Sequence, residues 1–369
     1  MRRFWGLLLV AVGAFALVLG LLVKFYAEPR IVRAPLDQKS STQSVSDGQS
    51  QVLDAGTGRM RQGLTLVANR EVRGVVDGSK DPNIAVWHTG NAIVDRPSGD
   101  TIHVDDETVA FDRVSGQAVN CCGEQLNGDP NVRHSGLFFK FPFGTERKTY
   151  QYWDTTARKP FPAVFKGTEN RDVVDGGTSK GQLEVYHFQQ VIPATALGTQ
   201  LVPPNYVGRP GTEPLQLTTT YTNTRDLWVE PISGEIVDGH EQPKQTLNDA
   251  GGAVLGTAFA TNIGYTQATR DAATLKASED AQSIYLVSSV LPAVLLGVGP
   301  LLLLVGLVLL YLDGRTRTAT TAGGDRGDGP VGEEGTVVDL RDDARSPETV
   351  DLTGGEGSQG PTRTQPGPA

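Results

Sequence analysis

Residues 284–312 form a long run without a charged side chain, IYLVSSVLPAVLLGVGPLLLLVGLVLLYL. A helix needs roughly 20 apolar residues to cross about 30 Å of hydrocarbon. A helix of a soluble domain rarely stays apolar on every face over such a length. The run therefore predicts a transmembrane helix at residues 288–312, preceded by a juxtamembrane helix at residues 266–287. Pro300 is expected to kink this span unless its neighbours compensate.

A second uncharged run, residues 4–23, follows Arg2 and Arg3 at the N-terminus. The apolar core of a cleaved signal peptide is about 7–15 residues long and ends at a site of small residues. This run is longer, and residues 24–29 (KFYAEP) carry no such site. We therefore expect an uncleaved signal anchor, so that the region between the two spans is attached to the membrane at both of its ends.

The charges beside the two spans indicate an orientation. Basic residues are enriched on the cytoplasmic side of membrane helices. Arg2, Arg3, Arg315 and Arg317 favour cytoplasmic ends, whereas Lys24, Arg30 and Arg33 oppose them. Long loops are translocated largely regardless of their charge. We predict that residues 1–3 and 313–369 lie in the cytoplasm and that residues 24–265 lie outside the cell membrane.

Glycines recur in both spans at a spacing of seven residues: Gly6, Gly13, Gly20, Gly299 and Gly306. Seven residues return to nearly the same face of a helix, so each span carries a narrow stripe without side chains. Such stripes allow two helices to approach closely in lipid. The alternative is that glycine is simply common in membrane helices.

The region between the spans has the sequence pattern that is typical of a β-protein. Short runs rich in Val, Ile, Thr and aromatic residues, such as IAVWHTGNAIV and LEVYHFQQVI, are separated by turn residues. Phe139, Phe141 and Phe143 alternate as on a half-buried strand, whereas the polar residues 34–50 are typical of a linker or an edge loop. We predict a mainly β fold, a large antiparallel β-sandwich or barrel-like domain at residues 24–265 between two transmembrane α-helices.

One turn pattern recurs: an apolar residue, an acid, two variable residues, Ser or Thr, and Gly. Copies begin at Asp54, Asp95, Asp112 and Glu230, and a copy at Asp154 lacks the glycine. The acid can accept hydrogen bonds from N–H groups of the turn, and the glycine supplies a positive φ. The pattern predicts a series of β-hairpins.

The two cysteines, Cys121 and Cys122, are adjacent. Two cysteines cannot form the disulfide framework of a small secreted scaffold. Three arrangements remain open: two free thiols, a vicinal disulfide, or a bond to another chain. The net charge of −9 is concentrated in residues 313–369, so the β-region is only mildly acidic and nucleic acid is not an expected partner.

No catalytic, cofactor or metal motif stands out in the sequence. The five histidines are scattered singly, and neither His103 nor His134 has a zinc spacing with the cysteines. Asp105, Asp106 and Glu107 are expected in a solvated loop rather than as a paired acid and base. We predict a non-enzymatic protein without a cofactor.

Three segments together carry a resemblance: KFPFGTERKTYQYWD (residues 140–154), GQLEVYHFQQVIP (residues 181–193) and RDLWVEPISGEIVDG (residues 225–239). With the two terminal spans, they resemble the actinobacterial PorA-like porin family, a domain family of unknown function. The resemblance extends over nearly the whole chain up to the second span. It implies an envelope protein with a membrane-anchored β-domain, and it transfers no catalytic residues.

Three functions follow as hypotheses. The first is a double-pass envelope protein whose β-domain binds a lipid, a glycan or an envelope protein. The second is a pore-forming oligomer, and the third is an envelope enzyme. Residues 313–369 are predicted to be a disordered acidic tail, and their repeated TVVDL and TVDL segments and Ser346 could serve a cytoplasmic partner or a kinase.

Overall fold

The computed structural model describes residues 2–54 and 56–321. The N-terminal helical segment consists of α1 (Arg2–Leu22), the π-helical turn η1 (Val23–Ala27) and α2 (Glu28–Ile31). The C-terminal segment consists of α3 (Gln267–Tyr285), the π-helical turn η3 (Leu286–Val290) and α4 (Leu291–Thr321). Helix α4 continues through Pro300 and extends to Thr321. The predicted tail lies outside the described residues from residue 322 onward.

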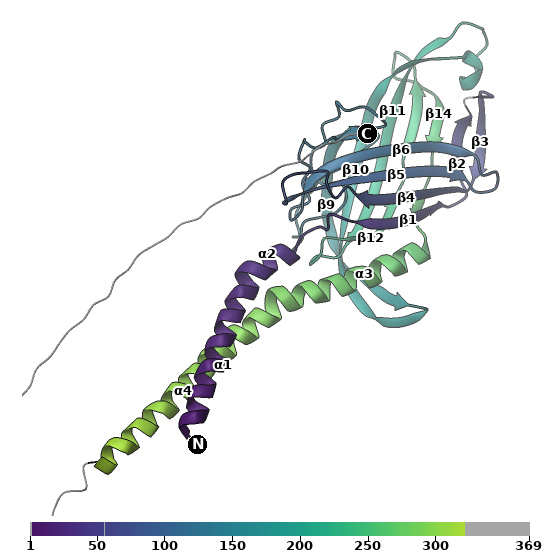
Figure 1. The fold of residues 1–369 in the computed structure, drawn as a ribbon. Helices are drawn as coiled ribbons and strands as arrows, with labels where there is room; N and C mark the ends of the chain where they lie inside the picture. The colour runs from purple at the N-terminus through teal and green to yellow at the C-terminus, as the bar shows by residue number, and fades with distance from the viewer. Residues whose placement is uncertain (1, 55, 322–369) are drawn as a thin grey trace, which may run out of the picture. The chain divides into compact units, whose positions relative to one another are not determined.

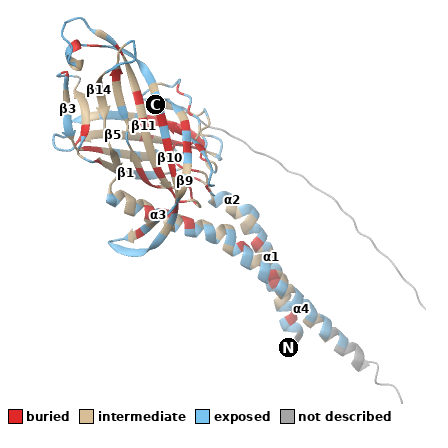
Figure 2. Ribbon diagram, turned by 180° about the vertical axis from the view of Figure 1, so that it is seen from behind, coloured by how far each residue is buried: buried red, intermediate tan, exposed pale blue. Residues whose placement is uncertain are grey.

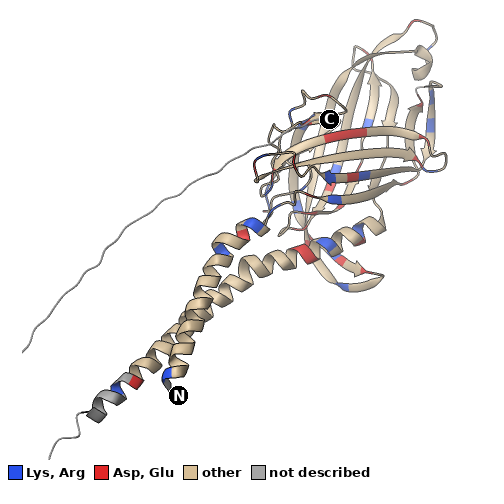
Figure 3. Cartoon of the chain, in the orientation of Figure 1, with Lys and Arg blue, Asp and Glu red and all other residues tan. Residues whose placement is uncertain are grey.

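Helices α1 and α4 lie side by side in antiparallel directions (Figure 1). A Cβ atom added at Gly13 would lie 2.7 Å from both the carbonyl oxygen of Gly299 and the backbone nitrogen of Leu303. Gly6, Gly20 and Gly306 face the opposite helix in the same way. The paired stretches carry no charged side chain (Figure 3). The two glycine stripes therefore form the face along which these helices pack.

The π-helical turns η1 and η3 contact each other where the helix pair ends. Lys24, in η1, donates from its ammonium to the carbonyl oxygen of Ser288 in η3, at 3.3 Å. A π-turn leaves a backbone carbonyl without its usual helical partner. Lys24 therefore contacts the helix at a π-turn, where a backbone carbonyl can accept a hydrogen bond from outside the helix.

The region between the helices is a single 15-stranded antiparallel sheet. The first strands are β1 (Lys39–Ser46), β2 (Ser50–Asp54), β3 (Arg59–Leu64), β4 (Leu66–Gly74), β5 (Ile84–Asp95), β6 (Thr101–Asp112) and β7 (Gln125–Leu126). They are followed by β8 (Tyr150–Asp154), β9 (Lys159–Asp175), β10 (Thr178–Val202), the 3₁₀ turn η2 (Pro204–Val207) and β11 (Leu215–Val229). The last strands are β12 (Ile236–Glu241), β13 (Lys244–Asn248), β14 (Val254–Ala260) and β15 (Ile263–Tyr265).

The sheet closes on itself as a barrel. One path runs β11-β12-β15-β1-β4-β5-β6, and another runs β11-β10-β9-β8. Isolated bridges join the ends of these paths: Phe111 with Ala118, Gln117 with Leu137, and Leu137 with Tyr152. The strands β10 and β11 cross behind β1, β4, β5 and β6 (Figure 1). Loop residues 117–118 and 137 thus take the place of strands at the seam.

Helix α3 packs against the barrel, on β9 and β12. Ala277 of α3 is buried with Val185 and Val237. The small side chains of α3 let its backbone approach the sheet closely, and Lys276 forms an ion pair with Glu235 at 2.5 Å. Buried residues are frequent in β5, β8 and β12, whereas most residues of β9 and β10 are exposed or half-buried (Figure 2).

Two sequence predictions are corrected here. Residues 34–50 are not a linker, because they contain β1, which pairs with both β4 and β15. Residues 137–143 are not a strand, although the alternation of Phe139, Phe141 and Phe143 suggested one. They form an irregular segment whose rings fill the core, where Phe141 is fully buried and stacks on Phe188 at 4.6 Å between ring centroids. The prediction of a mainly β domain between two apolar helices is confirmed.

The predicted hairpin turns are also confirmed. Asp112 accepts hydrogen bonds from the backbone N–H groups of Val114 and Ser115, at 3.1 and 2.7 Å. In each of the four copies with glycine, the N–H of that glycine donates to the carbonyl oxygen of the acid. The glycines have positive φ, and Arg158 takes this position in the copy that lacks glycine, with φ 53°.

Candidate functional site

A cavity of about 420 Å³ lies inside the barrel. Its walls come from β1, β4, β5 and β6 on one side and from β8, β11 and β12–β15 on the other. Part of the lining is apolar: Val52, Leu53, Ile93, Ile102, Phe259 and Ile263. The rest is polar, and its charged members are Arg70, His103, Asp105, Glu107, Asp154, Arg225 and Glu241. A space of this size, with apolar walls and convergent polar groups, suits a small ligand.

Arg225 joins three strands at one wall of the cavity. Its guanidinium pairs with Asp154 of β8 at 3.1 Å and with Glu241 of β12 at 2.9 Å, and it donates to the side-chain oxygen of Gln190 in β10 at 2.7 Å. Gln190 in turn donates to the backbone of β8, at the carbonyl of Tyr152. A buried guanidinium with several oxygen partners holds their geometry strongly. We interpret Arg225 as the internal cross-link of the barrel.

The two carboxylates beside Arg225 differ in their titration. Burial raises the pKa of Asp154, and the attraction of Arg225 offsets only part of this effect. Burial acts in the same direction on Glu241, but the charge and hydrogen bond of Arg225, together with Asn223 and Arg70, outweigh burial and lower the pKa of Glu241. Burial also opposes the charge of Arg225, and the two carboxylates more than compensate, so that its pKa is raised. Glu241 and Arg225 are therefore a charged pair.

His134 is fully buried between two glutamates. Its Nε2 lies 2.8 Å from Glu107 and its Nδ1 lies 3.2 Å from Glu124. Glu107 also accepts from the indole of Trp153 at 3.0 Å and from the hydroxyl of Thr155 at 2.7 Å. Within the described residues, the hydrogen bonds of this cluster are all to protein groups, so we interpret the cluster as positioning the loops that carry Glu124 and His134, although Glu107 also lines the cavity.

Burial alone would lower the pKa of His134, but its hydrogen bonds to Glu107 and Glu124 outweigh burial and raise the pKa. A raised pKa in the folded state means that the imidazolium contributes to stability. This contribution is complete below pH 6.5, the ordinary pKa of histidine, and is lost as the pH rises through the folded-state pKa.

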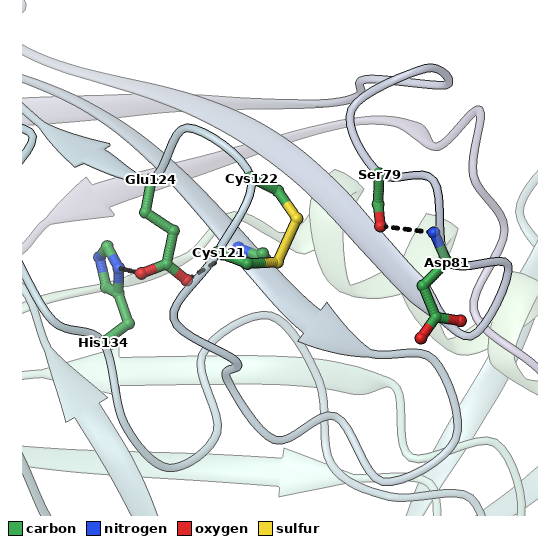
Figure 4. Close-up of a disulfide and its surroundings, with 7 residues drawn as sticks. Ser79, Asp81, Cys121, Cys122, Glu124 and His134 are labelled. Atoms are coloured by element: carbon green, nitrogen blue, oxygen red, sulfur yellow. Dashed lines mark hydrogen bonds and ion pairs between the residues drawn. A yellow bond between two sulfur atoms is a disulfide. The ribbon is translucent and has the colours of Figure 1, made fainter.

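Cys121 and Cys122 are joined by a disulfide in the structure. They belong to the same loop as Glu124, whose carboxylate reaches His134 (Figure 4). Cys122 has a φ of 66°, in the left-handed region. The disulfide lies between the seam residues 117–118 and β7.

A second hollow, of about 600 Å³, lies between α3 and the outer face of the sheet. Trp228 lines it, with His187 stacked on the indole at 4.9 Å and Arg171 over it at 4.6 Å. Among the described residues, no group of three His, Cys, Asp or Glu side chains is placed to hold a metal ion.

The sequence interpretation misplaced the acidic residues of β6 and missed the cavity. Asp105, Asp106 and Glu107 lie in a strand rather than in a solvated loop, and Glu107 is buried. Arg225 stands in the segment RDLWVEP, yet its role depends on partners far away in the chain. One signal was available: His103, Asp105 and Glu107 are two residues apart in β6, so they share one face of the strand, as inward-facing residues of a polar barrel do.

The sequence matches the profile of the family described as Porin PorA over residues 5–308. This match includes most of both helical segments and the whole barrel. The chain belongs to the Porin PorA family.

Two relatives within the PorA family are both described as Porin PorA. The protein of Corynebacterium amycolatum is 26% identical over 314 residues, which cover 66% of this chain and 77% of the relative. The protein of Corynebacterium resistens is 27% identical over 286 residues, which cover 59% of this chain and 66% of the relative. The predicted resemblance is confirmed, and the chain spans only part of each relative.

Two helices of this PorA family member are long and apolar enough to cross a membrane, at Arg3–Ile31 and Gln267–Asp313. Together with the porin relatives, they indicate a membrane protein.

Proposed function

We propose that this chain has a porin-like role in a membrane, and that it acts without enzymatic activity. The observation that carries the proposal is the family match over residues 5–308, because it includes the helices and the barrel together. The relatives carry the same family description. The proposed place is the cell membrane, with both termini in the cytoplasm.

The helix pair sets a condition on this role. The glycine faces of α1 and α4 pack against each other, so neither face is open to a second copy. The outward faces are apolar, with exposed side chains such as Phe15, Val298 and Leu304. A water-filled path needs polar lining, so one helix pair cannot provide it. We propose that several copies associate in the membrane to form the path.

Planar lipid bilayers test this role with the purified full chain. We expect stepwise conductance that rises with protein concentration. Gly13→Leu should abolish the steps, because it forces α1 and α4 apart. The control Gly297→Leu changes a position whose Cβ meets open space, and it should conduct like the unsubstituted chain. Absence of conductance at every protein concentration would contradict a porin-like role.

A second candidate function is favoured by the cavity: the barrel binds a lipid, a glycan or another ligand. The volume of about 420 Å³ and its mixed lining support this proposal. Native mass spectrometry of the chain in mild detergent should show a bound mass. Ala68→Phe should displace it by filling the cavity, whereas Val104→Phe, at an exposed position of β6, should retain it. An adduct that persists in Ala68→Phe would contradict binding in the cavity.

A further inference from the structure

Arg70 has spare hydrogen-bonding capacity inside the cavity. It lies on β4, and in the sheet register it stands between Thr42 of β1 and Asn91 of β5. Its Nε donates to the hydroxyl of Thr89 at 3.1 Å, and its guanidinium lies 5.1 Å from the ring centroid of Phe138. In residues 2–54 and 56–321, no carboxylate forms an ion pair with it. Two amino groups of the guanidinium therefore have no protein acceptor.

The carboxylates of the cavity are already engaged by other groups. Asp105 holds His103 at 2.9 Å, and Glu107 holds His134 and Trp153. The remaining two, Asp154 and Glu241, hold Arg225 as described above. A half-buried cation without a direct counter-ion is unfavourable and attracts an anion. Glu241 interacts with the charge of Arg70 at a distance, but no carboxylate among the described residues pairs with Arg70 directly, so a ligand is the available source of a contacting anion.

The neighbours of Arg70 can hydrogen-bond to hydroxyl groups. Within the part of the chain that the structure describes, no side-chain hydrogen bond involves five polar groups of the cavity lining: Thr42, Ser44, Asn91, Gln245 and Tyr265. Ser44 and Tyr265 are directly paired across β1 and β15. Hydroxyl and amide groups can both donate and accept, as the hydroxyls of a polyol do. An anion contact surrounded by such groups matches a charged, hydroxyl-bearing molecule.

We propose that the cavity binds the phosphate or carboxylate of a hydroxyl-bearing small molecule, such as a sugar phosphate, through the guanidinium of Arg70. The proposal rests on the second candidate function, ligand binding in the barrel. The anionic group accepts from the two free amino groups of Arg70, and the polyol contacts the surrounding Thr, Ser, Asn, Gln and Tyr side chains. The same chemistry occurs in a free sugar phosphate and in an anionic lipid headgroup.

Isothermal titration calorimetry of the full chain in detergent tests this inference. The free probes are glucose 6-phosphate and, as its neutral counterpart, glucose. The lipid probes are mixed micelles of phosphatidylglycerol and, as their counterpart without net charge, phosphatidylcholine. We expect glucose 6-phosphate or phosphatidylglycerol to bind at least about 10-fold more tightly than its counterpart, since a hydrogen bond to a charged group contributes this much. Binding of phosphatidylglycerol alone would assign the anion to a lipid headgroup.

The decisive variant is Arg70→Gln, with Arg73→Gln as its matched control. Arg73 lies on the same strand, with an exposed side chain paired with Glu71. Arg70→Gln should weaken binding by at least about 10-fold, and Arg73→Gln should leave it unchanged. Thermal unfolding of both variants checks that each is folded, and Arg70→Lys should retain part of the affinity if Arg70→Gln is unstable.

Several results would overturn the inference. The first is an equal loss of binding in Arg70→Gln and Arg73→Gln. The second is equal affinity for glucose and glucose 6-phosphate, with no preference for phosphatidylglycerol over phosphatidylcholine. The third is that neither anionic probe binds. If native mass spectrometry still shows a cavity adduct displaced by Ala68→Phe, ligand binding stands and only the anionic class fails. If that adduct is also absent, the ligand-binding function fails with it.

Discussion

At the scale of single residues, the recurrent acid–glycine turn shows how local chemistry builds the barrel. At Asp54, Asp112 and Glu230 the carboxylate accepts from N–H groups that the tight turn leaves without partners, and the residue four positions later adopts the left-handed conformation. At Gly234 this turn also approaches another segment, because Gly234 lies against the backbone of Phe141 and Pro142. The turn at Glu230 thus supports the irregular aromatic segment at residues 137–143.

Gly234→Ala should destabilise the chain by about 2–4 kcal/mol, because it adds both backbone strain and a clash with the carbonyl oxygens of Phe141 and Pro142. Gly99→Ala is the control, with φ 75° and open space around its Cβ. It should cost only about 1 kcal/mol. Urea denaturation followed by tryptophan fluorescence gives both values. An equal loss of stability in the two variants would show that the close contact between Gly234 and Phe141 adds nothing to the cost of the substitution.

Lys140 provides a pH-dependent prediction. Its ammonium is buried, donates to the carbonyl oxygen of Ser233 at 2.7 Å, and faces the ring of Phe143. Burial lowers the pKa of Lys140 from 10.5 to about 7. Between these two values the unfolded chain binds more protons than the folded one, so stability rises with pH through this window.

Replacing the lysine by Lys140→Met should remove this pH dependence. Relative to the unsubstituted chain, the variant should be more stable near pH 7, and its advantage should shrink by about 2 kcal/mol toward pH 9. Urea denaturation at the two pH values measures the change. The control Lys148→Met removes an exposed lysine of the same segment and should show no such trend. A constant difference for Lys140→Met would mean that Lys140 does not titrate in this range.

At the scale of elements, the helix pair and the barrel depend on different kinds of contact. Small residues let α1 and α4 approach until their backbones touch, which gains dispersion energy in lipid. The barrel instead depends on strand pairing, with bulges in β10 after Ile192 and Ala196 that allow a long strand to curve. Its seam is made by single bridges at residues 117–118 and 137.

Gly13→Leu should separate α1 from α4, because a Cβ already meets backbone atoms at 2.7 Å. We expect faster hydrogen–deuterium exchange in α1 and a lower melting temperature of the helix pair in detergent. Exchange measured by mass spectrometry reports on the helix alone. Gly297→Leu, which faces open space, should exchange as the unsubstituted chain does. Unchanged exchange in Gly13→Leu would show that the stripe does not hold the helices together.

At the scale of the whole molecule, the proposed orientation places the barrel outside and both termini inside. Ser179→Cys, at an exposed position near the start of β10, should react with a membrane-impermeant thiol reagent on intact cells. Arg3→Cys should react only after permeabilisation. Cys121 and Cys122 are paired in the structure, so they should give little background. The reverse labelling pattern would invert the topology, and with it the side on which the barrel meets a ligand.

Much of the architecture was predictable from the sequence, and the errors share one cause. The alternation rule assumes that the buried face of a strand is apolar. Here the interior of the barrel is partly polar, so β1, with Thr42 and Ser44 facing the cavity, resembled a linker, and Glu107 resembled a loop residue. For residues 137–143 the prediction was wrong in the opposite sense: this apolar loop at the seam has the alternating aromatic pattern of a strand and was predicted to be one.

The sequence alone determined the two membrane helices, the β-rich region between them and the hairpin turns, because each depends on residues close together in the chain. Only the tertiary structure decided which charges meet. Strands that are distant in sequence bring Arg225 to Asp154 and Glu241, and His134 to Glu107. Among the described residues, they leave Arg70 without a directly paired carboxylate. Ion pairs and cavities are set by the closure of the barrel, and no local pattern encodes them.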